Sequence, residues 1–225
     1  MTLVQRRPQP LARTTVHRGG VLVAWLGGSG DAAALRWALS WAHQTARDVT
    51  VLVTGQAATP GSAYRSHIAA ALGVPVGMTE APFMRILERS GDPVAALLTA
   101  GIRADVLVIP TGGPAPIPNR SLGRTVERVV ARHPGAVVVV PALYREDEEG
   151  WVVVGHDVEH VIVNDLARYA PIVRADSTAA MIDASRSASL VVARCHGHHP
   201  GALPASCQPL HIAASAWCPV LTVHA

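Results

Sequence analysis

The chain contains the same order of structural signals twice, and this duplication constrains its fold more than any other feature. In residues 104–141 a buried strand is followed by a loop rich in glycine and proline, a helix and a second buried strand. Residues 188–223 repeat this order with different amino acids. Because an internal repeat sets the number of structural units and the place of any ligand, the pattern predicts two related halves in one chain.

Apolar runs alternate with helical patterns throughout the first half. The expected strands are 21–26, 49–53, 83–87, 105–109 and 136–140, and the expected helices begin at Asp31 or span 62–72, 92–102 and 122–132. Strands that are apolar throughout and alternate with helices indicate a parallel sheet with helices on both faces. We therefore predict an α/β fold.

The second half is shorter than the first. Its expected strands are 151–155, a run that starts at Ile172, 190–192 and 220–223, and its expected helices are 177–186 and 210–217. The interval between His156 and Ile172 is much shorter than the matching interval of the first half. We expect that this half lacks one strand and one or two helices.

Composition suggests where the halves begin and end. Residues 1–19 carry four arginines and no acid, which predicts a disordered basic tail. Residues 144–150 read YREDEEG, a charged stretch without apolar periodicity, which predicts an acidic linker. The expected domains are 20–143 and 151–225.

The composition also excludes several classes of function. With 49% hydrophobic and 16% charged residues the chain is expected to fold, and no apolar run is long enough for a membrane helix. No secretory signal is present, and three cysteines suit reduced thiols, so we expect a cytoplasmic protein. All 19 lysine-plus-arginine residues are arginines, which excludes Schiff-base chemistry and a phosphate-binding lysine. A net charge of +3 does not predict a nucleic-acid or membrane partner.

Several stretches resemble the universal stress protein family, in the tandem form common in actinobacteria. VLVAWLGGSGDAAALRWALSWA is similar to that family's first strand, turn and helix, and the stretch from ADVLVIP to AVVVVP is similar to its fourth strand, loop, helix and fifth strand. WVVVGHD and WCPVLTV resemble the first and last strands of a second, degenerate and truncated repeat. The resemblance implies a doubly wound sheet of order 3-2-1-4-5 in the first repeat. It also implies an internal pseudo-dimer, in which strand 136–140 pairs with strand 220–223.

The same resemblance implies a nucleotide site between the ends of the first and fourth strands. The residues that it assigns to ATP or another adenine nucleotide are Gly27, Gly112, Gly113, Gly123, Arg124 and Thr125. The family's pattern is incomplete, because Leu26 stands where ATP-binding members have aspartate and Pro110 stands at the first glycine position. Prolines 114, 116 and 118 also remove N–H donors from the phosphate loop.

The arginine that begins the fourth helix allows two other interpretations. Arg124 and the helix dipole could together hold some other nucleotide or anion. Alternatively, arginines 120, 124, 128 and 132 form only a solvated helix face.

Histidine and cysteine side chains gather at the corresponding place in the second half. The predicted metal ligands, for zinc or another soft divalent ion, are His156, Asp157, Cys195, His196 and His198. Their spacing matches no established zinc pattern, and loop histidines in a degenerate repeat need no function. Both interpretations stay open.

No catalytic grouping stands out in the sequence. Ser29 is not a nucleophile elbow, because Asp31 stands where that motif needs glycine. The tryptophans at 25, 37, 41 and 217 are expected in the core. The favoured hypothesis is a non-catalytic universal stress protein-like sensor or accessory protein that has a partly eroded nucleotide site and acts through a protein partner. The alternatives are an ATP-binding or ATP-hydrolysing enzyme of the adenine-nucleotide hydrolase-like fold, and a metal-binding protein. Homodimerisation of the whole chain is left open.

Overall fold

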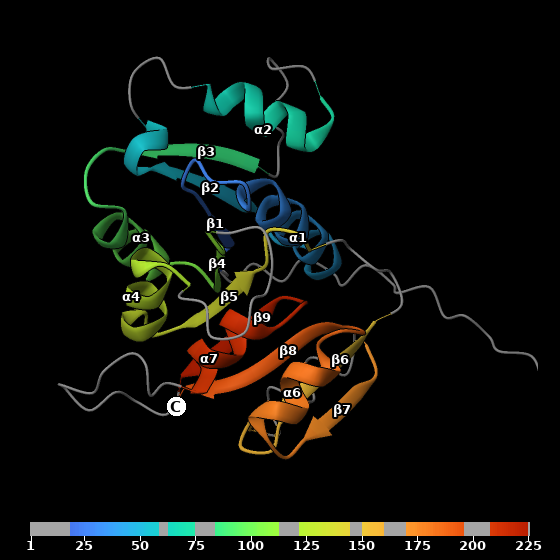
Figure 1. Ribbon diagram of the computed structural model, residues 1–225. Helices are drawn as coiled ribbons and strands as arrows, with labels where there is room; N and C mark the ends of the chain where they lie inside the picture. Colours follow the sequence, from blue (N-terminus) through green and yellow to red (C-terminus); the bar gives the residue numbers. More distant parts are fainter. Residues whose placement is uncertain are drawn as a thin grey trace, which may run out of the picture.

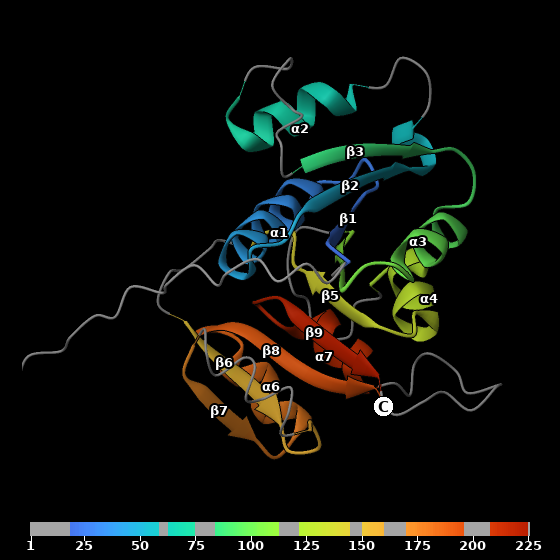
Figure 2. The ribbon, with the colours of Figure 1, turned by 180° about the vertical axis from the view of Figure 1, so that it is seen from behind.

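The computed structural model describes residues 19–58, 63–74, 84–112, 122–144, 150–159, 170–195 and 208–224. These residues form one nine-stranded sheet with helices packed on its two faces (Figures 1 and 2). The α/β prediction is therefore confirmed.

The elements follow one another in the predicted order. The strands are β1 (Val21–Trp25), β2 (Val49–Thr54), β3 (Met84–Arg89), β4 (Val106–Pro110), β5 (Ala136–Val140), β6 (Trp151–Gly155), β7 (Ile172–Ala175), β8 (Ala188–Cys195) and β9 (Val220–His224). The helices are α1 (Asp31–Thr45), the short 3-10 helix η1 (Gly55–Ala58), α2 (Tyr64–Leu72), α3 (Pro93–Gly101), α4 (Arg124–Arg132), α6 (Thr178–Ala184) and α7 (Gln208–Ser215). Two of the expected strands, β5 and β6, have the expected bounds, and the other elements shift by a few residues.

The sheet joins the two halves edge to edge. Its strand order is β3-β2-β1-β4-β5-β9-β8-β6-β7. The first half thus has the predicted order 3-2-1-4-5, and every neighbouring pair within each half is parallel. In the second half β7 lies at the sheet edge, and no described strand takes the place that β3 has in the first half. Among the described residues, this agrees with the predicted loss of one strand.

The junction between the halves is an antiparallel pair of strands. Val138 of β5 lies opposite Leu221 of β9, as the predicted pairing of strands 136–140 and 220–223 requires. Next to it, the fully buried hydroxyl of Thr222 donates a hydrogen bond to the carbonyl oxygen of Val137 at 3.1 Å. This pairing covers two strand edges that would otherwise be open to other chains.

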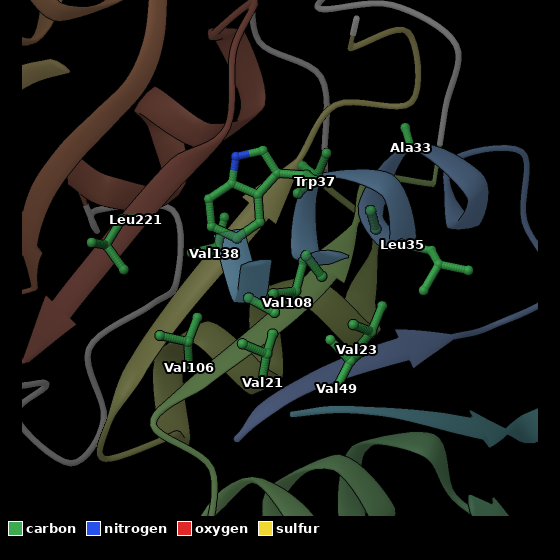
Figure 3. Close-up of a cluster of buried hydrophobic side chains, with 14 of the residues drawn as sticks. Val21, Val23, Ala33, Leu35, Trp37, Val49, Val106, Val108, Val138 and Leu221 are labelled. Carbon is green, nitrogen blue, oxygen red and sulfur yellow. The ribbon is translucent and has the colours of Figure 1, made fainter. Parts of the chain in front are cut away.

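Two hydrophobic layers lie on opposite faces of the sheet. On one face, α1 and α2 pack against alternate side chains of the strands, and Figure 3 shows Leu35 and Trp37 over the valines of β1, β4 and β5. Leu221 of β9 belongs to the same cluster. On the other face, α3, α4, α6 and α7 cover the remaining side chains of both halves. Both layers cross the β5–β9 junction, so the two halves share their core.

Side-chain caps define where two of the helices begin. The Asp92 carboxylate accepts the N–H groups of Val94 at 3.2 Å and Ala95 at 3.4 Å, and Pro93 occupies the first helical position of α3. An aspartate followed by proline is a typical helix start, and α3 begins within one residue of the predicted helix 92–102. In the second half, Ser177 caps α6 by accepting the N–H of Ala180 at 3.2 Å.

The prediction for the tryptophans is confirmed only in part. Trp25 and Trp37 are buried, and Trp37 stacks on Trp41 with ring centroids 5.5 Å apart. The prediction was wrong for Trp217, which is 46% exposed, with the Arg186 guanidinium 5.2 Å from its ring centroid. Trp217 lies after the end of α7, in the turn that leads to β9, and therefore is not on the helix face that packs against the sheet.

The predicted tail and most of the predicted linker lie outside the described residues. None of the described helices is both long enough and apolar enough to cross a membrane.

Candidate functional site

The candidate site lies where the parallel strands β1 and β4 end side by side. After β1 the chain turns through residues 26–30 into α1, and after β4 it continues through Thr111 and Gly112. Gly30 packs so closely on β4 that a Cβ atom there would lie 2.6 Å from the Thr111 carbonyl oxygen. Two hydrogen bonds link Thr111 to the end of β5. Its N–H donates to the carbonyl oxygen of Val140 at 2.9 Å, and its hydroxyl accepts the N–H of Ala142 at 3.1 Å.

The turn between β1 and α1 is organised by the side chain of Asp31. One carboxylate oxygen, Oδ2, accepts three backbone N–H groups, from Leu26 at 3.1 Å, Gly27 at 2.7 Å and Gly28 at 3.0 Å. Gly27 has a φ of 85°, a conformation that favours glycine. The turn is thus an anion-binding nest whose anion comes from the first residue of α1.

Burial changes the acidity of this carboxyl group. Asp31 is 1% exposed, and its other oxygen, Oδ1, has no hydrogen-bond partner among the residues that the structure describes. Loss of solvation raises the pKa of Asp31 from 3.8 to about 6, although the three N–H groups and the more distant His67 act in the opposite direction. At neutral pH the turn therefore holds a buried negative charge.

This arrangement affects the residues assigned to a nucleotide at β1. Gly27 lies in the turn as predicted, but its N–H group is already bonded to Asp31. The family's aspartate position is held by Leu26, and the carboxylate of this turn comes instead from Asp31, five residues along the chain. A phosphate placed on the same N–H groups would have to displace that carboxylate.

The other side of the predicted nucleotide site is the start of α4. Gly123 is the N-cap residue, with a φ of 90°, and no N-cap side chain accepts a hydrogen bond from the first turn. Arg124 is exposed and Thr125 is half-buried. Gly112 ends the described segment after β4, and Gly113 lies outside the described residues. The structure thus puts Gly123, Arg124 and Thr125 together at one helix start.

In the second half, the corresponding crevice contains an arginine side chain of β8. The Arg194 guanidinium donates to the carbonyl oxygen of Asp157 at 3.2 Å and forms an ion pair with Glu159 at 3.5 Å. Arg174 of β7 also reaches this turn, where it donates to the carbonyl oxygen of His156 at 3.5 Å. Two guanidinium groups therefore hold the chain that leaves β6.

The predicted metal ligands are only partly within the described residues. His156 is exposed, Asp157 is half-buried and Cys195 is fully buried at the end of β8. His196 and His198 lie outside the described residues. Within the described ranges, no three histidine, cysteine, aspartate or glutamate side chains lie close enough to hold a metal ion.

Two residues that shape these crevices were not assigned roles from the sequence. Asp31 was expected only to begin a helix, yet an acid directly after a Gly-Gly-Ser-Gly turn is a recognisable signal for capping. Arg194 follows the apolar run of the expected strand 190–192 and carries no motif that indicates a role. Arg194 contacts the turn after β6 only because β8 pairs with β6, and no local sequence signal predicts this pairing.

Comparison with known proteins gives similarity at the level of the fold. No protein-family model and no curated protein sequence matches the chain significantly. A structure from Pseudomonas aeruginosa assigned as a universal stress protein matches 91% of this chain and 92% of its own, with 13% identity and a TM-score of 0.62. A universal stress protein from Archaeoglobus fulgidus matches 90% of this chain and 98% of its own, with 11% identity and a TM-score of 0.59.

A third solved structure, a universal stress protein in complex with cAMP, matches 56% of this chain and 98% of its own, with 23% identity. Its TM-score of 0.43 is too low to support an argument about this chain. The first two matches extend over both halves, and the chain therefore has a universal stress protein-like fold.

Proposed function

We propose that the chain is a non-catalytic accessory protein of the tandem universal stress protein type. In this proposal it binds a nucleotide or a similar phosphorylated anion at the start of α4 and acts through a protein partner. The fold supports the type of protein, and the sequence resemblance supports the class of ligand.

One observation supports the proposed location of the ligand at the start of α4. The two helix starts at the candidate site differ, because the turn before α1 binds its own Asp31 carboxylate, whereas the N-cap residue of α4 is Gly123, which has no side chain. Arg124 is exposed beside that start, and it contacts no carboxylate among the described residues. A phosphate group at the start of α4 would therefore meet the positive end of a helix dipole and the Arg124 guanidinium, without a competing N-cap carboxylate from Gly123.

The same features predict weak binding. A phosphate held at α4 would gain no N–H donors from the turn after β1, and Glu127 adds a negative charge in the first turn of α4. The loop before α4 contains three prolines, which cannot donate.

Native mass spectrometry of the whole chain, with magnesium and ATP at millimolar concentration, tests this proposal. The expected result is an ATP adduct that Arg124→Gln weakens by roughly three- to tenfold, the range expected for a charge-assisted contact. Arg128→Gln is the matched control, because Arg128 is exposed one turn further along α4. The control should leave the adduct unchanged.

Two results would overturn the proposal. Absence of an adduct with the unmodified chain would exclude the nucleotide site, and equal losses in the two variants would show that binding depends on general charge. Phosphate release is measured in the same samples, since ATP turnover that disappears in Arg124→Gln would favour the nucleotide-hydrolysing enzyme instead.

A further inference from the structure

An open groove of about 1170 Å³ lies on the α3 side of the sheet, between α3 and the edge strand β3. Its floor includes Leu22 of β1, Thr50 of β2 and Leu87 of β3. The groove exists because α1 and α2 cover the other face of β2 and β3, whereas α3 packs over β1 and β2. The side chains that α3 turns toward it are alanines and a threonine, which are too short to fill the space.

Three arginine side chains line this groove. Arg85 and Arg89 belong to β3, and Arg103 follows α3. All three are exposed, and none forms an ion pair with a described residue. Arg85 uses its Nε atom to donate to the Thr50 hydroxyl at 3.1 Å, which leaves its terminal nitrogens for another partner.

The acids near the groove neutralise its positive charge only in part. Asp92 lines one end, but its two carboxylate oxygens accept the N–H groups that begin α3. Glu88 alternates to the opposite face of β3, where it contacts Tyr64 and Arg65 of α2. Asp48 and Asp92 therefore bring two negative charges to the described lining, against three positive charges from the arginines. The groove carries excess positive charge.

The arrangement of the arginines indicates the shape of a ligand. Arg85 and Arg89 lie four residues apart on one strand, which separates their Cα atoms by about 13 Å. Leu87 lies between them on the same side of β3. Arg103 lies at the same end of the sheet as Arg85. Its backbone is next to Gly19, just before β1, and the adjoining Gly20 is next to Asp48, just before β2. The first residue of β2, Val49, pairs with Met84, the neighbour of Arg85. Arg85 and Arg89 thus flank an apolar position on β3, with Asp48 near the Arg85 end and Asp92 near the Arg89 end.

An extended peptide has the matching periodicity. Its side chains at positions i, i+2 and i+4 point the same way and span about 13 Å. Carboxylates suit guanidinium groups because the two can form paired hydrogen bonds. None of the described lining residues is aromatic, so they offer no platform on which nucleic-acid bases could stack.

We propose that this groove binds an extended acidic peptide of a partner protein, with an acidic residue, an apolar residue and a second acidic residue at alternate positions. The two acids would contact Arg85 and Arg89, and the apolar residue would lie on Leu87. The inference goes beyond nucleotide binding, because the groove does not include Arg124.

Fluorescence anisotropy with the whole chain and a labelled peptide of sequence GSEALAESG tests the proposal. Binding is expected at low salt and is expected to weaken at high salt, because the contacts are exposed ion pairs. The peptide GSQALAQSG, which lacks both charges, should not bind. The peptide GSEEALASG, which has the same charge with adjacent acids, should bind more weakly than the first.

Variants of the chain test whether binding depends on the groove or only on the net charge of the protein. Arg85→Gln and Arg89→Gln should each weaken binding by roughly three- to tenfold. Arg36→Gln is the matched control, since Arg36 is exposed on α1, on the other face of the sheet, and should leave binding unchanged. Circular dichroism spectra and melting temperatures show whether each variant is folded.

The possible outcomes are distinct. Loss of binding in the two groove variants but not in the control supports the proposal. Absence of peptide binding at low salt, equal binding of the uncharged peptide, or equal effects of all three variants would overturn it. Preferential binding of an oligothymidylate, lost in Arg85→Gln, would overturn the peptide assignment in favour of nucleic acid.

Discussion

The Oδ2 atom of Asp31 accepts the backbone N–H of Gly27 at 2.7 Å, so the glycine-rich turn after β1 binds a side chain of its own helix. In sequence, a strand followed by a glycine-rich turn and a helix is typical of a phosphate-binding turn. Here the donors are already satisfied, and the charge that satisfies them is buried. The turn after β1 therefore has the conformation of a phosphate-binding turn, but its N–H groups bind a side chain of the protein itself.

Replacement of Asp31 by asparagine should remove a pH dependence of stability. Because the pKa of Asp31 rises from 3.8 in its ordinary state to about 6 in the folded chain, the folded state binds more protons than the unfolded state between these values. This contribution lowers stability as pH rises through that window. Between about pH 4 and pH 7.5, the unfolding free energy of Asp31→Asn should therefore rise relative to that of the unmodified chain by roughly 2 kcal/mol. Urea denaturation at both pH values measures this shift, and a difference that is independent of pH would contradict it.

Replacement of Gly30 by alanine should destabilise the chain, because the added Cβ would lie 2.6 Å from the Thr111 oxygen and 3.0 Å from Pro110. The expected loss is about 1–3 kcal/mol, as for other overpacked sites. Gly28→Ala is the control, since no atom lies within 4 Å of its added Cβ, and it should cost about 0.5 kcal/mol or less. Thermal unfolding of the two variants makes the comparison, and similar melting temperatures would show that the turn does not press on β4.

Replacement of Arg194 by glutamine should cost more stability than replacement of its ion-pair partner. Arg194 also donates to the Asp157 carbonyl oxygen, so Arg194→Gln is expected to lower the unfolding free energy by about 1 kcal/mol. Glu159 is 59% exposed, and Glu159→Gln should cost less than about 0.5 kcal/mol. Denaturant titrations of both variants test this order. A larger loss for Glu159→Gln would mean that the ion pair, and not the backbone contact, holds the turn after β6.

Replacement of Thr222 by valine should weaken the junction between the halves. The change removes the buried hydrogen bond from the Thr222 hydroxyl to Val137 while it keeps the volume of the side chain. The expected loss of unfolding free energy is about 1 kcal/mol. Thr222→Ser keeps the hydroxyl but removes a methyl group. Hydrogen exchange of the β5 and β9 amides should increase in Thr222→Val, and unchanged exchange at both strands would count against a role of this bond in the junction.

Local sequence signals were enough to predict much of the fold. Apolar runs such as Val137 to Val140 indicate strands buried on both faces, and the Asp92-Pro93 pair indicates a helix start. These signals are local because burial and capping depend on a few neighbouring residues. The pairing of β5 with β9 was predicted from the family resemblance rather than from local signals, since 85 positions separate Thr222 from Val137.

The candidate site was less predictable. Gly123, Arg124 and Thr125 adjoin one another in the chain, so their common place at the start of α4 follows once the helix is known. The sequence did not show that the Gly27 N–H is bonded to Asp31. The pattern of glycines is the same whether the N–H groups of the turn are unoccupied or bonded to that carboxylate. The groove between α3 and β3 left no signal either, since its arginines come from segments separated in sequence.

By itself, the sequence determined the order of strands and helices, the duplication and the residue types at each turn, because these depend on periodicity and on backbone preferences. Only the tertiary structure decided which of those residues are available to a ligand. Asp31 and Arg194 occupy the two crevices because packing brings them there, whereas Arg85 and Arg89 stay exposed because α3 leaves their side of the sheet uncovered. Availability depends on which surfaces are buried together, and that is a property of the whole fold.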